Sequence, residues 1–308
     1  MWLNSAVLEW KMQRSNKRIV FRQCKSGAKG KIGNRNYIDN ISSNFKKNKL
    51  DFLYCDDINY SYQSQDIVVN VINEDKELPI LSDDNTIVCN KISTAHLLSN
   101  KVNTLKRYTE NGIVTPQECN WSKCRKCLSF SPTGSNEEVK ILDRYSYLDA
   151  KNHNVDLIDT RHEWNGKTYH TSLRLLSVCG EVIDIWLRLR TGKEFPIVHS
   201  KNTPLDSKVL NFLHQEIIEC NKDKLENISK SLSNILGLGF FAHDLLVDTN
   251  NKFYVCESGF KFDDETYRKH LSPIMRDLQF GENVFNPKQL AKKSSDSLIK
   301  YLEKQNFI

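Results

Sequence analysis

The 308-residue chain has no apolar run that approaches the roughly 20 residues needed to cross a membrane. It does not open with a basic segment followed by an apolar stretch, so we expect no signal peptide. It also lacks a zinc-finger pattern and the aromatic motif of ribonucleoprotein modules, and it has no internal repeat or low-complexity segment. These absences predict a globular cytoplasmic protein with neither a membrane partner nor a nucleic-acid partner.

The nine cysteines are odd in number and scattered along a chain that is large enough to fold without disulfides. We therefore expect reduced thiols. Cys119, Cys124 and Cys127 have the spacing C-x4-C-x2-C, which matches part of a plant-type iron–sulfur pattern. The next cysteine is the distant Cys179, and a zinc site completed by Cys89 or a histidine is an alternative. Three cysteines without a convincing fourth ligand favour free thiols.

Positive charge is concentrated near the beginning of the chain. The net charge is +6, and twelve lysines and arginines against one acid, Asp39, fall between Lys11 and Leu50. Such a stretch could contact a polyanion or an acidic substrate. A solvated basic surface is the commoner explanation of a charge run, and we favour it.

Short apolar segments separated by polar connections predict a small α/β domain over about residues 15–95. Its expected strands are Ile19–Phe21, Leu50–Leu53, Asp66–Val71 and Thr86–Cys89. A helical period over Ile92–Asn111 then predicts one helix, which Gly112 ends. A further strand is expected at Val139–Leu142. Two hairpins are expected, one pairing Tyr169–Val178 with Val182–Arg190 and the other pairing residues 243–247 with 252–256. Helical segments are expected over Ser207–Leu236 and Lys288–Gln305.

The hairpin at residues 243–256 is the most informative feature. Asp244 lies near the start of one strand and Glu257 at the end of the next, so antiparallel pairing places them side by side. Two carboxylates that close repel each other unless a positive partner lies between them. Mg²⁺ held by oxygen ligands and substrate phosphates is the natural candidate. A surface hairpin with two solvated acids is the alternative, since two carboxylates make a weak motif.

Four cations could share a site with these acids. Lys101 lies in the predicted helix, and Arg174 lies on one strand of the long hairpin. Arg188 and Arg190 lie two positions apart on the other strand, and so on the same face. Cations on phosphate oxygens and acids on a metal could together frame a nucleoside triphosphate. For any single arginine, a surface salt bridge is the commoner role.

Four segments follow one another along the chain: Asn100-Lys101 to Gly112-Ile113-Val114-Thr115-Pro116; Asp156-Leu157-Ile158-Asp159; Leu173-Arg174-Leu175 through Gly180-Glu181-Val182 to Arg188; and Asp244-Leu245-Leu246-Val247-Asp248 to Val255-Cys256-Glu257. Their order and spacing resemble the ATP-grasp superfamily, and in particular its carboxylate–amine ligases, such as glutathione synthetase, D-alanine–D-alanine ligase and the glutamate-tail ligases. The resemblance spans about residues 65–265, and the chain is identified as a divergent member.

The resemblance implies an α/β protein with the ATP-grasp fold. Residues 1–95 would form a small N-terminal α/β lobe, residues 96–160 a helix and an abbreviated lid, and residues 161–308 a C-terminal lobe with an antiparallel sheet and the metal-binding hairpin. The implied enzyme uses ATP and Mg²⁺ to activate a carboxylate as an acyl phosphate and joins it to an amine, on a substrate such as a peptide or an acidic molecule. A kinase that uses the same site and a catalytically inactive nucleotide-binding protein are the alternatives.

The resemblance also assigns roles to individual residues. The nucleotide would be held by Lys101, Lys140, Asp156, Leu157, Ile158 and Glu163. The catalytic residues would be Arg174, Arg188 and Arg190, together with His243 by its position alone. The metal ligands would be Asp244 and Glu257 with Asp263 or Asp264. Two departures stand out. Gly259 occupies the place of the family's third metal ligand, an asparagine, which is why the two later aspartates are considered. Lys140 is the best substitute for the lid lysine, because the usual strand before a glycine-rich loop is not evident.

Overall fold

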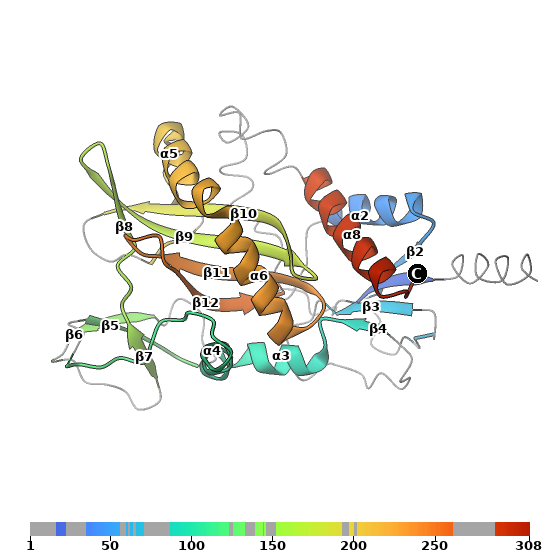
Figure 1. Ribbon diagram of the computed structural model, residues 1–308, viewed down its shortest axis with the longest axis horizontal. Coiled ribbons are helices and arrows are strands. Elements are labelled where there is room, and N and C mark those ends of the chain that lie inside the picture. Colours follow the sequence, from blue (N-terminus) through green and yellow to red (C-terminus); the bar gives the residue numbers. More distant parts are fainter. Residues whose placement is uncertain are drawn as a thin grey trace, which may run out of the picture.

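The computed structural model describes most of the chain as one mixed α/β structure (Figure 1). The described residues are 17–22, 35–55, 60, 62–63, 66–70, 87–122, 126–132, 139–143, 145, 152–192, 197–199, 202–260 and 287–308. Asp263 and Asp264 therefore lie outside the described residues. No helix in the described part of the chain is long and apolar enough to cross a membrane.

A parallel sheet of four strands, the N-terminal sheet, forms the first unit. Its order is β2-β1-β3-β4, with β1 at Arg18–Arg22, β2 at Asp51–Cys55, β3 at Asp66–Asn70 and β4 at Ile87–Cys89. The four predicted strands are confirmed within a few residues. The helix α2, Arg35–Lys47, was not predicted from the sequence, and it buries Tyr37, Ile41 and Phe45 at a spacing of four.

The segment predicted as one helix over Ile92–Asn111 is instead two helices, α3 at Ile92–Ser99 and α4 at Lys101–Glu110. The break is at Asn100, whose backbone is extended and whose side-chain oxygen accepts a hydrogen bond from the Asn103 amide at 3.1 Å. Asparagine is a favoured N-cap because its side chain satisfies an otherwise unpaired amide. The break makes Lys101 the first residue of α4. Gly112, at a φ of +77°, ends the second helix as predicted.

A small sheet of three antiparallel strands follows, in the order β6-β5-β7. Its strands are β5 at Lys126–Phe130, β6 at Lys140–Asp143 and β7 at His153–Asp156. The predicted strand near residues 139–142 is confirmed, whereas β5 was not predicted. Leu105 of α4 packs with Phe130 and Val155 in a hydrophobic cluster separate from the main core, so α4 is joined to this sheet.

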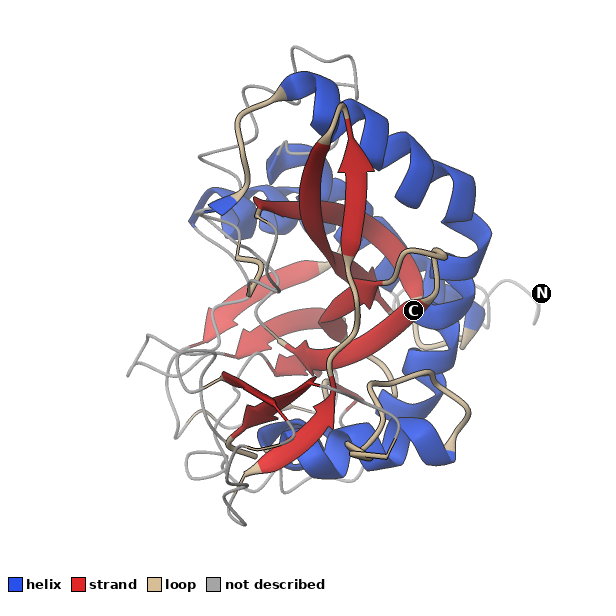
Figure 2. Ribbon diagram, turned by 90° about the vertical axis from the view of Figure 1, so that its left-hand side faces the viewer, coloured by secondary structure: helices blue, strands red, loops and turns tan. Residues whose placement is uncertain are grey.

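The large sheet is antiparallel, in the order β10-β9-β11-β12, and β8 pairs with β9 beside it. The strands are β8 at Arg161–Trp164, β9 at Lys167–Val178, β10 at Glu181–Thr191, β11 at Phe240–Val247 and β12 at Phe253–Gly259. Both predicted hairpins are confirmed. Helices α5 (Ser207–Ile217), η4 (Glu219–Asn221), α6 (Lys222–Leu236) and α8 (Pro287–Lys304) complete the described elements, and Figure 2 shows the helices gathered beside the sheets.

The C-terminal helix α8 returns to the N-terminal sheet and packs against α2 (Figure 1). The Asn44 side-chain amide of α2 contacts Ser295 and donates to Asp296 Oδ1 at 2.9 Å. The main hydrophobic core runs without interruption from the N-terminal sheet to the large sheet. The small sheet is thus the part of the described structure that rests least on this common core, whereas α4 contributes Tyr108 to it.

Candidate functional site

A cleft lies between the small sheet, the start of α4 and one face of the large sheet. Its empty space, including solvent at the mouth, is about 1120 Å³. The small sheet and α4 supply an apolar bed of Leu105, Leu128, Phe130, Val139, Ile141 and Val155. The opposite wall, on the large sheet, carries the charged side chains Arg188, Asp244 and Glu257, and Lys101 faces this charged wall from the start of α4. A cleft that is apolar on one side and charged on the other suits a ligand with a flat apolar part and an anionic part.

The two carboxylates predicted to lie side by side do so. Asp244 of β11 pairs directly with Glu257 of β12, and both line the cleft. The register shifts immediately afterwards, so that Leu245 pairs with Val255 and Cys256 becomes the extra residue of a β-bulge. The Cys256 thiol donates to the backbone carbonyl of Asp244 at 3.0 Å, which secures the bulge.

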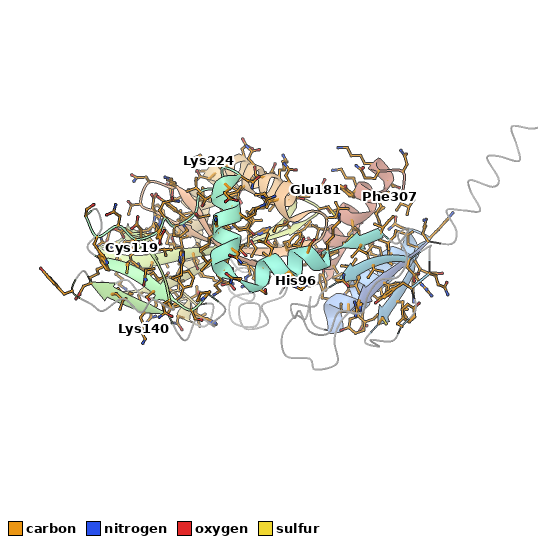
Figure 3. All side chains as sticks on the ribbon, turned by 90° about the horizontal axis from the view of Figure 1, so that it is seen from below. His96, Cys119, Lys140, Glu181, Lys224 and Phe307 are labelled. Carbon is orange, nitrogen blue, oxygen red and sulfur yellow. The ribbon has the colours of Figure 1, made fainter. Side chains whose placement is uncertain are left out.

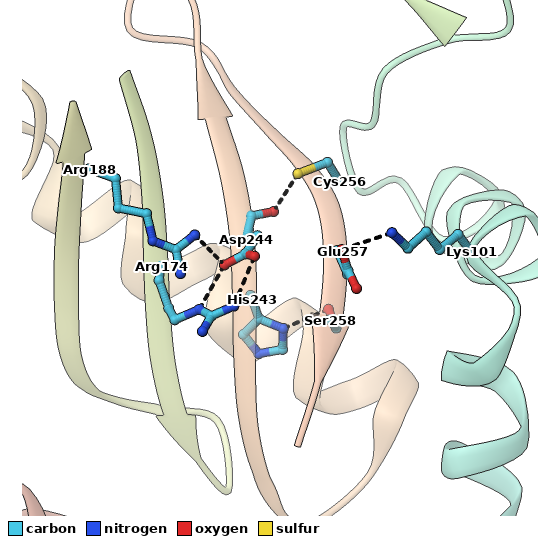
Figure 4. Close-up of polar contacts among 8 residues, drawn as sticks. All are labelled: Lys101, Arg174, Arg188, His243, Asp244, Cys256, Glu257 and Ser258. Atoms are coloured by element: carbon cyan, nitrogen blue, oxygen red, sulfur yellow. Dashed lines mark hydrogen bonds and ion pairs between the residues drawn. The ribbon is translucent and has the colours of Figure 1, made fainter. Parts of the chain in front are cut away.

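The chain itself supplies the positive partners of Asp244 (Figure 4). Arg174 of β9 donates to both carboxylate oxygens, from Nε to Oδ1 at 2.9 Å and from Nη2 to Oδ2 at 3.0 Å. Arg188 of β10 adds a third contact, from Nη1 to Oδ1 at 3.1 Å. Burial disfavours the charged carboxylate, but the two guanidiniums outweigh burial and hold the pKa of Asp244 well below its usual range. Asp244 is therefore ionised at neutral pH.

Glu257 is paired with Lys101 across the cleft, with Nζ and Oε2 at 3.2 Å. The Glu257 side chain is 42% exposed, so this ion pair is open to exchange with a ligand. Lys101 is held more firmly, because its backbone amide donates to the Pro132 carbonyl at 2.9 Å and its ammonium lies 6.0 Å from the centre of the Phe130 ring. The first residue of α4 thus links the small sheet to the large sheet.

The geometry can accommodate a divalent cation. A carboxylate offers about four lone-pair positions, and the contacts to Asp244 use three of them. Together with the exposed Glu257, this leaves carboxylate oxygens for a Mg²⁺ ion that takes its other ligands from phosphates and water. Gly259 has no side chain to offer as a third ligand, and no group of three metal-ligating side chains converges within the described residues.

Two buried polar atoms at the cleft have no hydrogen-bond partner among the residues that the structure describes. Asp156 Oδ1 lies where β7 leads towards β8, next to Leu157 and Ile158, which also line the cleft. Ser172 Oγ lies on β9, where Ser172 pairs directly with Arg188 of β10. Buried polar atoms are normally paired, so a ligand with hydrogen-bonding groups would complete this wall.

Five of the predicted site residues that the structure describes do not line the cleft. One of them, Arg174, is joined to the cleft wall only through its hydrogen bonds to Asp244. Lys140 lies on the edge strand β6 between Val139 and Ile141, which do line it, so its side chain faces away (Figure 3). Glu163 is exposed on β8 and accepts a hydrogen bond from Thr168. Arg190 donates to the Ile197 carbonyl at 2.9 Å, and His243 is buried on the far side of β11 from Asp244.

His170, Ser172 and Thr160 line the cleft but were not predicted. His170 is buried, and its Nδ1 lies 3.2 Å from Thr160 Oγ1. A signal for the two β9 residues was present in the sequence. His170 and Ser172 precede Arg174 at steps of two, so one face of a strand carries all three polar side chains.

The three closely spaced cysteines are predicted to bind no metal in the purified protein. Cys127 is buried in β5, Cys119 is partly exposed, and Cys124 lies outside the described residues. Elemental analysis should therefore find far less than one zinc or iron per chain, with no visible iron–sulfur absorption. About one equivalent of zinc, lost together with the fold of the small sheet on chelation, would contradict the prediction.

Sheet order, hairpin register and cleft together define the ATP-grasp fold, and comparison with solved structures confirms the predicted fold. The chain resembles PsnB, an ATP-grasp ligase solved with a minimal precursor, Mg and ADP, with a TM-score of 0.54 and 10% identity over 94% of this chain and 99% of that chain. It also resembles a RiPP-associated ATP-grasp ligase of Chryseobacterium gregarium, solved with ADP and a leader and core peptide, with a TM-score of 0.53 and 12% identity over 92% of this chain and 97% of that chain. No family model and no curated protein sequence matches the chain.

Proposed function

We propose that this protein is an ATP-dependent ligase that activates a carboxylate as an acyl phosphate and joins it to an amine. The fold supports the proposal, because the similar structures are ATP-grasp ligases. The observation that carries it is the arrangement at the charged wall of the cleft. Lys101 faces Glu257 at 3.2 Å, and Asp244, directly paired with Glu257, holds Arg188 in the same cleft.

The two ends of the cleft match the two ends of a nucleotide. The adenine ring would lie on the apolar bed beside Leu157 and Ile158, with Asp156 Oδ1 available as an acceptor. The phosphates would then reach Lys101 and Arg188, where charge-assisted hydrogen bonds are stronger than neutral ones. The Lys101–Glu257 pair would open as phosphate replaces the carboxylate at the ammonium.

The reaction follows from this placement. A substrate carboxylate oxygen attacks the γ-phosphorus, the bond to the β,γ-bridging oxygen breaks, and ADP leaves with an acyl phosphate formed. The amine nitrogen then attacks the acyl carbon, phosphate departs, and the amine proton passes to solvent. Lys101 and Arg188 neutralise the phosphate charge, and Arg174 keeps Asp244 and hence Arg188 in place. Mg²⁺ held by Asp244 and Glu257 would supply further positive charge at the phosphates.

A peptide is the substrate class that we propose first, since related ligases were solved with precursor and leader peptides. The test is a reaction of the purified protein with ATP, Mg²⁺ and pools of carboxylate and amine peptides, followed by mass spectrometry. ADP release that requires both partners, with a condensed product, supports the ligase. A phosphorylated product without condensation identifies a kinase instead.

A nucleotide-binding protein without turnover is the second candidate. Two observations favour it: Gly259 offers no third ligand, and both Asp244 oxygens already accept from arginines. Under this alternative ATP binds tightly, but no combination of substrates releases ADP. Calorimetry and the peptide assay together separate the two candidates.

Lys101→Ala should weaken ATP binding by roughly one to two decades, because one charge-assisted contact contributes about 1.5–3 kcal/mol in a partly dry cleft. The fold should persist, since Glu257 can be solvated once its partner is lost. Calorimetry with ATP measures the effect. The control is Lys106→Ala, an exposed lysine of the same helix, and equal affinities for both variants would remove Lys101 from the site.

A further inference from the structure

On the face of the large sheet that is turned away from the cleft, a group of buried polar side chains is linked by hydrogen bonds. The proposed reaction does not use these side chains. His243 of β11 is 1% exposed, with Nδ1 at 2.8 Å from Ser258 Oγ and Nε2 at 3.0 Å from Ser177 Oγ. Tyr108 of α4 is fully buried, and its hydroxyl donates to Ser258 Oγ at 2.7 Å. Three strands of the large sheet and one helix are thereby joined through hydroxyls and one imidazole.

Two of these linked side chains belong to residues that are next in sequence to the carboxylates of the proposed site. His243 precedes Asp244 and Ser258 follows Glu257, and the two are directly paired across the hairpin (Figure 4). Neighbouring residues of a strand face opposite sides of a sheet. The carboxylates therefore point into the cleft while His243 and Ser258 point away from it. These two side chains are thus on the wrong side of the sheet to touch the nucleotide.

Through Tyr108, the hydrogen-bonded group of side chains reaches α4, the helix that carries Lys101. The two residues are seven apart, which is close to two turns, so they share one face of α4. From that face, Lys101 contacts Glu257 and Tyr108 contacts Ser258. Two successive residues of β12 thus bind one face of α4, one from each side of the strand.

Every member of this group of side chains has a hydrogen-bond partner within it. Tyr108 donates to Ser258, and each ring nitrogen of His243 has a serine hydroxyl as its partner, Ser258 at Nδ1 and Ser177 at Nε2. A buried network in which each link has a partner rigidifies the elements that it joins.

We infer that Tyr108, Ser258, His243 and Ser177 form a positioning network, which sets the rotation of α4 so that the Lys101 ammonium faces Glu257. The role of this placement in binding ATP rests on the proposed function, whereas the placement of Lys101 opposite Glu257 does not. It also replaces the acid–base role predicted for His243: the histidine acts through its neighbours on the hairpin and does not meet the substrate.

Tyr108→Phe tests the network by removing only the hydroxyl. We expect ATP affinity, measured by calorimetry, to fall roughly 5-fold in the otherwise unchanged protein and less than about 2-fold in the Lys101→Ala background, because residues that act through one another are not additive. Equal losses in the two backgrounds would overturn the inference, since a purely structural effect does not depend on Lys101. Tyr169→Phe, which removes the hydroxyl of another buried tyrosine, is the control and should leave affinity unchanged.

A second readout needs no nucleotide. In the ligand-free protein, labelling of Lys101 by an amine-reactive acylating reagent, followed by peptide mass spectrometry, should become several-fold faster in Tyr108→Phe and not in Tyr169→Phe. Ser258→Ala should reproduce the increase, and Ser258→Thr, which keeps the hydroxyl, should restore slow labelling. Unchanged labelling in both Tyr108→Phe and Ser258→Ala would refute the network. Faster labelling in a protein that binds no ATP would uphold the network and reject the proposed function.

Discussion

Glu257→Gln is expected to abolish ATP turnover while leaving the protein folded. The amide keeps the shape of the side chain but removes the negative charge that Mg²⁺ and Lys101 require. Stability should change little, because the Glu257 side chain is half exposed and a surface ion pair contributes at most about 1 kcal/mol. Mg²⁺-dependent ADP release and a thermal unfolding curve, recorded on the same preparation, measure both parts of the prediction.

Glu303→Gln, an exposed glutamate of α8, is the matched control and should retain full activity. Full activity in Glu257→Gln would show that the hairpin is not the metal site of an ATP-grasp enzyme. Asp263→Asn and Asp264→Asn test separately whether either later aspartate replaces the ligand missing at Gly259. If both are silent while Glu257→Gln is inactive, the site functions with water in the third position.

Asp244→Ala should lower the free energy of unfolding by about 3–5 kcal/mol, in contrast to Glu257→Gln. Removing this carboxylate leaves the guanidiniums of Arg174 and Arg188 without their shared anion, and both arginine side chains are largely buried. An uncompensated buried charge is far more costly than an exposed one. Urea unfolding of the variant gives the value.

Asp159→Ala provides the comparison for this prediction. Asp159 also accepts two hydrogen bonds from the guanidinium of one arginine, Arg161, but both side chains are more than a third exposed. We expect a loss of at most about 1 kcal/mol there. Equal losses for the two aspartates would mean that the Arg174–Asp244–Arg188 group is solvated like a surface ion pair.

Features set by local pattern could be predicted from the sequence. The β11–β12 hairpin follows from two alternating apolar runs around a turn, and its register places Asp244 opposite Glu257 as expected. The bulge at Cys256 was not predictable, because it depends on how β12 meets β11. The helix α2 was not predicted, because Tyr37, Ile41 and Phe45, which form its buried face, lie in a segment rich in polar and basic residues.

Features set by distant parts of the chain could not be predicted in the same way. The sequence places Arg174 seventy positions before Asp244, and their pairing follows only from the strand order, in which β11 lies beside β9. The expected positive partner between the carboxylates was assumed to be a metal, whereas the chain's own cations pair with both acids in this structure. Lys140 and His243 were chosen by position along the chain, and strand alternation turns both away from the cleft.

A structure of the protein with a non-hydrolysable ATP analogue and Mg²⁺ tests the central claim most directly. The account predicts adenine on the apolar bed beside Leu157 and Ile158, and phosphates between Lys101 and Arg188. It also predicts that the Lys101–Glu257 contact is broken and that Glu257 is turned to the metal. An analogue bound elsewhere, or a cleft that stays empty at saturating analogue with Lys101 still paired to Glu257, would contradict it.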